Sequence, residues 1–249
     1  MHLRKIILNM SLNIEHSLKV QLNRHFSENT QEDGYNIVRR FLDKHEKIQD
    51  NINYKIRTNS PYNCDLLKKY IRNFALWNFV ELLSFGEFIT FYKYYCDLYE
   101  KNNDILSLLL PVKFIRNAAA HNNCLINSLK RQIKHEYVKV NSDFNLSKKL
   151  NTMVSKIPKI NPDSRIKKMK IPVIHDFAAL LFAFDKVVDS KSIKHYTYQS
   201  LIVMIERFNR NIDYFSKNDI IKSTINFLAK VVDNFDYFAY NDINDQKLK

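Results

Sequence analysis

Glycine is scarce in this chain. Only two of the 249 residues are glycine, Gly34 and Gly86, where an average chain of this length holds roughly 17. Dinucleotide-binding and P-loop motifs need glycines where the backbone approaches phosphate, so both are excluded. β-Sandwiches and propellers need many tight turns with left-handed residues, which so few glycines cannot supply. With 45% apolar residues and five prolines, the composition favours long helices around a single core.

Cysteines and long apolar runs are also few. The three cysteines, Cys64, Cys96 and Cys124, have no zinc-ligand spacing, and so sparse a set is typical of reduced thiols in the cytoplasm. The most apolar stretch, 177–188, contains Asp185 and Lys186 and is too short to cross a bilayer. The N-terminal residues lack a cleavage site and read as an amphipathic helix. We therefore expect a cytoplasmic protein with no membrane partner.

Acidic residues are outnumbered. The chain has 39 Lys and Arg against 26 Asp and Glu, a formal charge of +13. Such an excess attracts polyanions, nucleic acid above all. However, an A/T-rich coding sequence also produces abundant Lys and Asn. The charge alone therefore does not decide whether the protein binds nucleic acid.

The apolar residues recur at helical spacing over most of the chain. The pattern predicts an all-α protein of about eight helices, organised as a single domain over 1–249. One helix is expected over about 111–130, with Pro111 in its first turn. A long basic loop is expected over about 136–172, because three prolines and the run Ser164–Lys170 interrupt the pattern. C-terminal helices follow over about 174–238, the first of them capped by Asp176, and Trp77 is expected in the core.

One helical segment carries residues suited to phosphodiester chemistry. Arg116, Asn117 and His121 lie within six residues, and at ~100° per residue Asn117 and His121 nearly share a face. An imidazole transfers protons near neutral pH, and a guanidinium stabilises phosphate charge. In RNA the 2′-hydroxyl supplies the nucleophile, so this chemistry needs no metal and no cofactor. The alternative is a surface amide at Asn117 and a core histidine at His121.

Further residues are candidate RNA contacts. Arg39 and Arg40 could bind phosphate, although a solvated surface explains such residues equally well. The same two interpretations apply to the main set: Lys113, Asn122, Asn123, Lys130, Arg131, Arg165, Lys167, Lys168 and Lys170.

Five segments together resemble a known family. They are 12–20, 32–42, 75–95 with its LSFG stretch, 115–129 with RNAAAHNNCL, and 174–188. In this order they resemble abortive-infection (Abi) proteins of the AbiD/AbiF type, and Arg-x4-His resembles the signature of the HEPN superfamily. Such proteins usually carry an aromatic, basic stretch before the helix that here begins at Leu3. The chain is therefore either truncated or naturally short.

The resemblance implies a function. HEPN domains pair through the motif helix, which the three alanines Ala118–Ala120 would suit, and catalytic members are metal-independent ribonucleases that leave a 2′,3′-cyclic phosphate. We therefore expect a homodimeric RNA-cleaving toxin of phage defence, with Arg116, Asn117 and His121 at its site. The alternative is a non-catalytic protein that forms a ribonucleoprotein with a cognate small non-coding RNA. A helical interaction protein without RNA is the third reading.

Overall fold

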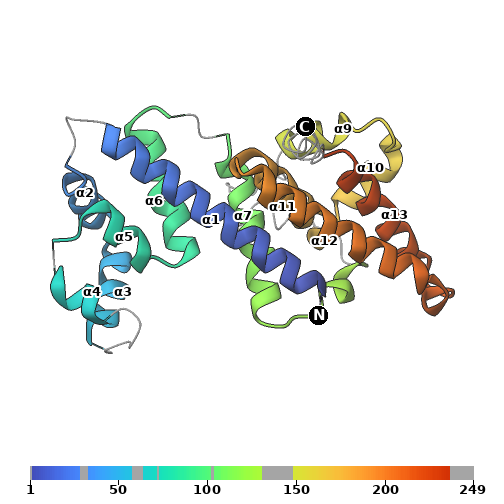
Figure 1. Cartoon of the computed structure of the whole chain (residues 1–249), viewed down its shortest axis with the longest axis horizontal. Helices are drawn as coiled ribbons and strands as arrows, with labels where there is room; N and C mark the ends of the chain where they lie inside the picture. The colour runs from blue at the N-terminus through green and yellow to red at the C-terminus, as the bar shows by residue number, and fades with distance from the viewer. Residues whose placement is uncertain are drawn as a thin grey trace, which may run out of the picture. The chain divides into compact units, whose positions relative to one another are not determined.

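The computed structural model describes residues 2–28, 33–57, 64–71, 73–101, 104–130 and 148–235. Every regular element in these ranges is a helix and none is a strand, which confirms the all-α prediction. None of these helices is long and apolar enough to cross a membrane. The chain divides into two compact units, coloured by residue number in Figure 1: unit 1 contains Met1–Ile14 and Ser107–Lys249, and unit 2 contains Glu15–Leu106.

Unit 2 is built around aromatic side chains. The long helix α1 (His2–Glu28) contributes its second part, followed by α2 (Asn36–Lys44), α3 (Glu46–Arg57), α4 (Cys64–Lys69), α5 (Leu76–Leu82) and α6 (Phe85–Leu98). The rings of Phe41, Phe79 and Phe91 are fully buried, and Phe91 lies edge-on to the other two at centroid separations of 4.9 and 5.2 Å. Such edge-to-face pairs add to the stabilisation from burial alone.

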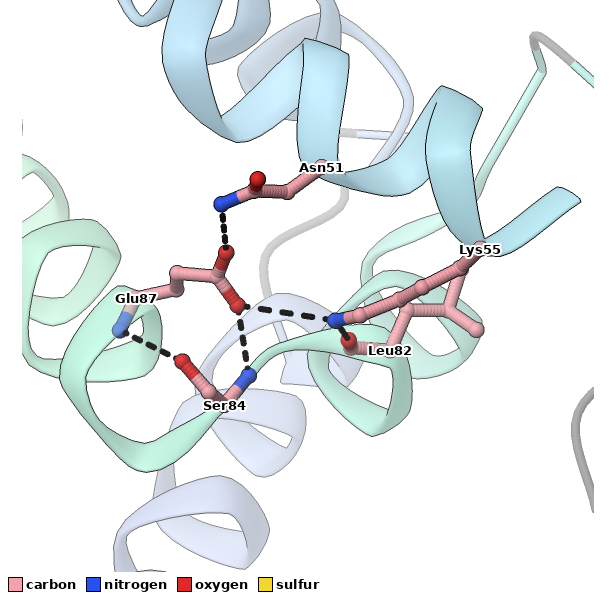
Figure 2. A network of polar contacts seen from close by, with 5 residues as sticks. All are labelled: Asn51, Lys55, Leu82, Ser84 and Glu87. Carbon is pink, nitrogen blue, oxygen red and sulfur yellow. Dashed lines mark hydrogen bonds and ion pairs between the residues drawn. The ribbon is translucent and has the colours of Figure 1, made fainter. Parts of the chain in front are cut away.

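A polar network fixes α3 against the corner between α5 and α6 (Figure 2). The Glu87 carboxylate accepts hydrogen bonds from the Ser84 backbone N–H at 2.7 Å and from the Asn51 amide at 2.9 Å. Lys55 donates to the Leu82 carbonyl and lies 3.6 Å from Glu87. Ser84 and Glu87 also form a capping box that starts α6. Glu87 therefore links α3 to the start of α6.

Unit 1 begins with the first part of α1 and continues from α7 (Leu106–Ala120). It also contains the 3₁₀ turns η1 (Leu125–Ser128) and η2 (Ile212–Phe215), and the helices α9 (Lys148–Ser155), α10 (Pro162–Met169), α11 (Pro172–Val187), α12 (Lys191–Arg210) and α13 (Asp219–Asp233). The central helix is α11, which packs against α9, α10, α13 and η1. Its apolar residues surround the whole helix axis, as is typical of a buried helix.

The loop over 136–172 and the buried place of Trp77 are predictions that differ from the structure. Within that stretch, residues 148–155 and 162–169 instead form α9 and α10. Pro162 starts α10 at its first turn, where the missing N–H costs nothing, and the Asn161 side chain caps it by accepting from the Asp163 N–H at 2.8 Å. Trp77, expected in the core, is 54% exposed and lies edge-on to Tyr35.

Candidate functional site

The candidate site lies at the C-terminal end of α7, within unit 1. The helix buries one face, which includes Val112, Ile115 and Ala119. On another side, Lys113, Asn117 and His121 follow one another every four residues, which brings them to one side of the helix. Lys113 and Asn117 are half-buried and His121 is exposed. The open side of α7 therefore carries a cation, an amide and an imidazole in a row.

The bounds of α7 differ from the predicted 111–130. The helix begins at Leu106, so Pro111 lies inside it and not at its start. It ends at Ala120. The apolar residues Leu125 and Leu129 are buried, but they belong to η1 and to the turn after it. Arg116 and Asn117 thus occupy the last turn of the helix, while His121 stands just beyond it.

A backbone motif ends the helix at this point. Asn123 N–H donates to the Ala118 carbonyl at 2.9 Å, and Asn122 N–H to the Ala119 carbonyl at 3.3 Å. Asn122 has φ of 57°, in the left-handed region. This is the Schellman arrangement, in which glycine or asparagine takes the left-handed position. The Arg4 guanidinium of α1 donates to the Asn122 carbonyl at 3.0 Å and fastens this end of α7.

The three motif residues are linked through Asn117. Arg116, half-buried, donates from Nη1 to the Asn117 side-chain oxygen at 3.4 Å. The Asn117 backbone carbonyl accepts from the His121 N–H at 2.9 Å. The His121 imidazole itself makes no hydrogen bond to any of the described residues. One chain therefore brings a guanidinium and an exposed imidazole to the same helix end, with the imidazole left accessible to a ligand.

The sequence matches the profile of a known protein family. The sequence profile of the Abi-like protein family matches residues 1–127, which is more than half of the chain and includes all of α7. This protein belongs to the Abi-like family. Membership links it to abortive infection, a defence against phage. No curated protein and no solved structure matches the chain.

In this Abi-like protein, Arg39 and Arg40 lie on α2, and the remaining residues of the main set of candidate RNA contacts lie in two places. Beyond α7, Asn122, Asn123 and Lys130 are exposed, and Arg131 lies outside the described residues. The others lie on or just after α10, which packs against α9, α11 and α13. Along that helix, Lys167 and Lys170 are exposed.

Two basic residues of α10 are partly covered. Arg165 and Lys168 are half-buried. The Lys168 ammonium donates to the Ser223 hydroxyl at 2.7 Å and to the Thr224 hydroxyl at 2.9 Å. Burial lowers the pKa of Lys168, because a buried ammonium loses hydration. Lys168 is therefore directed at α13, whereas its neighbours Lys167 and Lys170 face solvent.

His175 and Asp176 form a buried histidine–carboxylate pair away from the candidate site. The His175 ring nitrogen Nδ1 lies 2.9 Å from an Asp176 oxygen, and the His175 side chain is 2% exposed. Burial raises the pKa of Asp176, and the contact with His175 opposes that shift. The sequence predicts Asp176 as the cap of α11, and this prediction is wrong. The helix begins at Pro172, and Ile171 is its cap residue. The pair instead lies within the buried helix α11.

Two functional details escaped the sequence interpretation. The left-handed turn at Asn122 places His121 at the helix end, and an asparagine after a run of alanines was the available signal. The hydrogen bond from Arg4 to Asn122 could not be predicted from the sequence, because the two residues are 118 positions apart. Among the described residues, no three His, Cys, Asp or Glu side chains are grouped so as to hold a metal ion.

Proposed function

We propose that this Abi-like protein is a metal-independent endoribonuclease of the AbiD/AbiF type and the HEPN superfamily, acting in the cytoplasm during abortive infection. The observation that carries the proposal is the end of α7. There, the Arg116–Asn117 contact and the exposed imidazole of His121 lie within two turns of one helix. A guanidinium and an imidazole together serve the two needs of RNA cleavage, charge stabilisation and proton transfer.

The reaction uses the substrate's own hydroxyl. A neutral imidazole accepts the 2′-hydroxyl proton while the 2′-oxygen attacks the phosphorus. The bond from phosphorus to the 5′-oxygen breaks, and that oxygen takes a proton from an imidazolium. The products are a 2′,3′-cyclic phosphate and a 5′-hydroxyl. Arg116 stabilises the charge on the phosphoryl oxygens, and Asn117 holds the guanidinium through its side-chain oxygen.

Two chains are proposed to share the reaction. Proton removal and proton delivery need two groups, and the end of α7 offers one imidazole per chain. Ala118 is half-buried and Ala120 is exposed, so this part of the helix surface has little bulk. A second copy of α7 can approach such a surface closely. A homodimer would bring two His121 side chains and two Arg116 side chains to one RNA.

A non-catalytic RNA-binding role is the second candidate. The observation that favours it is the His121 imidazole, which no described residue of the chain orients by a hydrogen bond. An unoriented imidazole can still donate to a phosphate, together with Arg116, Lys113 and Asn123. In that case the protein would hold a cognate small non-coding RNA in a ribonucleoprotein without cutting it.

The experiment incubates the purified protein with RNA in the presence of EDTA. Wild-type protein is expected to cleave, and His121→Ala and Arg116→Ala to lose cleavage by about 100-fold or more, a typical effect of removing a general acid/base or a charge-stabilising group. The matched control is His16→Ala. It also removes an exposed histidine, but one that lies on α1, and it should keep full activity.

The outcomes separate the candidates. Intact RNA in a salt-sensitive complex supports the ribonucleoprotein, because phosphate contacts weaken with salt. Cleavage that persists in His121→Ala rejects the assigned catalytic role. Cleavage that stops with EDTA rejects the metal-independent mechanism.

A further inference from the structure

Unit 2 contains a cavity that the proposed ribonuclease does not use. The cavity measures about 710 Å³ and is lined by residues of α2 and α3 together with Tyr35, Ile71, Asn73 and Phe74, all of them in the part of unit 2 that Figure 1 colours blue to teal. Ligand pockets in proteins usually measure about 300–1,000 Å³. The cavity is therefore large enough for a compact organic ligand. It belongs wholly to unit 2, whereas Arg116 and His121 belong to unit 1.

The floor of the cavity is apolar. Val38 from α2, Ile52 from α3 and Phe74 line it and are all buried. On another side, α3 is anchored through Asn51 and Lys55, as Figure 2 shows. An apolar floor of this kind suits a flat, weakly hydrated group such as a nucleobase.

Polar residues also line the cavity. Asn53 and Asn73 contribute side-chain amides, each of which both donates and accepts hydrogen bonds. Nucleobase edges present the same mixture of donors and acceptors. Tyr35 forms part of the wall, and its ring lies edge-on to Trp77 with centroids 6.1 Å apart.

The charged residues of the lining favour an anion. Arg39 from α2 and Arg57 from α3 both line the cavity and are exposed, against one carboxylate, Asp43. No described residue forms an ion pair with either guanidinium within 4.0 Å. A guanidinium binds phosphate through paired hydrogen bonds. Two arginines from different helices above an apolar floor therefore match a ligand with a phosphate at one end and a flat ring at the other.

We propose that this cavity is a nucleotide-binding site, in which Arg39 and Arg57 hold the phosphate, the apolar floor takes the base, and Asn53 and Asn73 contact its edge. The nucleotide is either free or one unit of a bound RNA. The site is independent of RNA cleavage, so it holds whether or not α7 is catalytic.

The test is calorimetric titration of the full chain with the four nucleoside 5′-monophosphates and with a 2′-O-methyl RNA decamer. The decamer lacks the free 2′-hydroxyl, so cleavage cannot obscure binding. Arg39→Gln and Arg57→Gln are each expected to weaken binding about tenfold or more, since each removes a charge-assisted contact to phosphate. Lys47→Gln removes an exposed cation of α3 that does not line the cavity, and this variant should bind within about twofold of wild type.

The two sources of nucleotide give different results. Saturable binding of a monophosphate that both cavity variants weaken identifies a free nucleotide. Binding of the decamer alone, weakened by the same variants, identifies a unit of RNA. The proposal is overturned if neither ligand binds or if inorganic phosphate binds as tightly as the nucleotides. It is also overturned if Lys47→Gln weakens binding as much as the cavity variants. Circular dichroism and Trp77 emission check that each variant is folded.

Discussion

Replacing Glu87 by glutamine tests the polar network that holds unit 2 together. The carboxylate, 13% exposed, accepts from the Ser84 N–H and from the Asn51 amide, one at each oxygen. An amide in its place keeps one acceptor and turns the other into a donor, so one of these two N–H groups loses its partner. Asn51 and Ser84 are exposed, so water can solvate the donor that loses its partner, and the cost is the net contribution of one hydrogen bond, about 0.5–1.5 kcal/mol. We expect Glu87→Gln to lower the free energy of unfolding by about 1 kcal/mol.

Urea unfolding monitored by Trp77 fluorescence measures this effect. The chain has one tryptophan, and it lies on α5 in unit 2, so its emission reports the unit that contains the network. Glu81→Gln is the matched control, because it removes an exposed carboxylate of α5, outside the network. It is expected to change stability by less than about 0.5 kcal/mol. Equal effects of the two substitutions would refute the structural role of Glu87.

The same variant predicts a pH dependence. Burial alone would raise the pKa of Glu87, but hydrogen bonds from Ser84 and Asn51 and the charge of Lys55 outweigh it and lower the pKa. A carboxyl whose pKa is lower in the folded state stabilises the fold above its unfolded pKa, about 4.3. That stability is lost as the pH falls through the folded value. The difference in free energy of unfolding between wild type and Glu87→Gln should therefore be largest at pH 6 and become smaller near pH 3. A difference that is unchanged at pH 3 would contradict this assignment.

Three further substitutions test other parts of the structure. Asn122→Val should destabilise the end of α7 by about 1–2 kcal/mol in thermal melts while Asn122→Gly is tolerated, because Asn122 has a left-handed φ of 57°; equal effects would contradict this. Burial raises the pKa of Asp176, so its ionisation costs stability as pH rises above the unfolded pKa. Asp176→Asn should then stabilise more at pH 7 than at pH 4, and the same gain at both would refute it. Ala120→Trp should place a bulky ring on the exposed side of α7, and light scattering that still shows a dimer would reject pairing through this helix.

The sequence predicts the helices of the C-terminal half well, because their apolar stripes are long and regular. The stripe that includes Phe177, Leu181 and Phe184 corresponds to the buried helix α11, and the stripe that includes Ile225 and Val232 corresponds to α13. In both helices tertiary burial follows directly from the apolar residues.

Helix ends are predicted less well, because they depend on single backbone residues. The spacing of Ala119, Leu125 and Leu129 fits one continuous helix, yet the left-handed Asn122 ends α7 and a 3₁₀ turn buries Leu125 instead. The prolines of 136–172 predict a loop, although Asn161 and Pro162 together start the helix α10.

Contacts between distant residues could not be predicted from one sequence. The bond from Asn51 to Glu87 joins residues 36 positions apart, and one cavity is lined by Arg39 from α2 and Arg57 from α3. For the candidate site, the sequence identifies Arg116, Asn117 and His121 by residue type and spacing. The contact between Arg116 and Asn117, and the exposed place of His121 beyond the helix, come from the structure.

The chemical ends of the RNA products test the central claim most directly. Attack by the 2′-hydroxyl, with Arg116 and His121 at the end of α7, leaves a 2′,3′-cyclic phosphate on one fragment and a 5′-hydroxyl on the other. Mass spectrometry of a short RNA incubated with the wild-type chain in EDTA identifies both ends. The account predicts these two ends, absent with His121→Ala. Fragments that carry a 5′-phosphate, or RNA that remains intact, would contradict it.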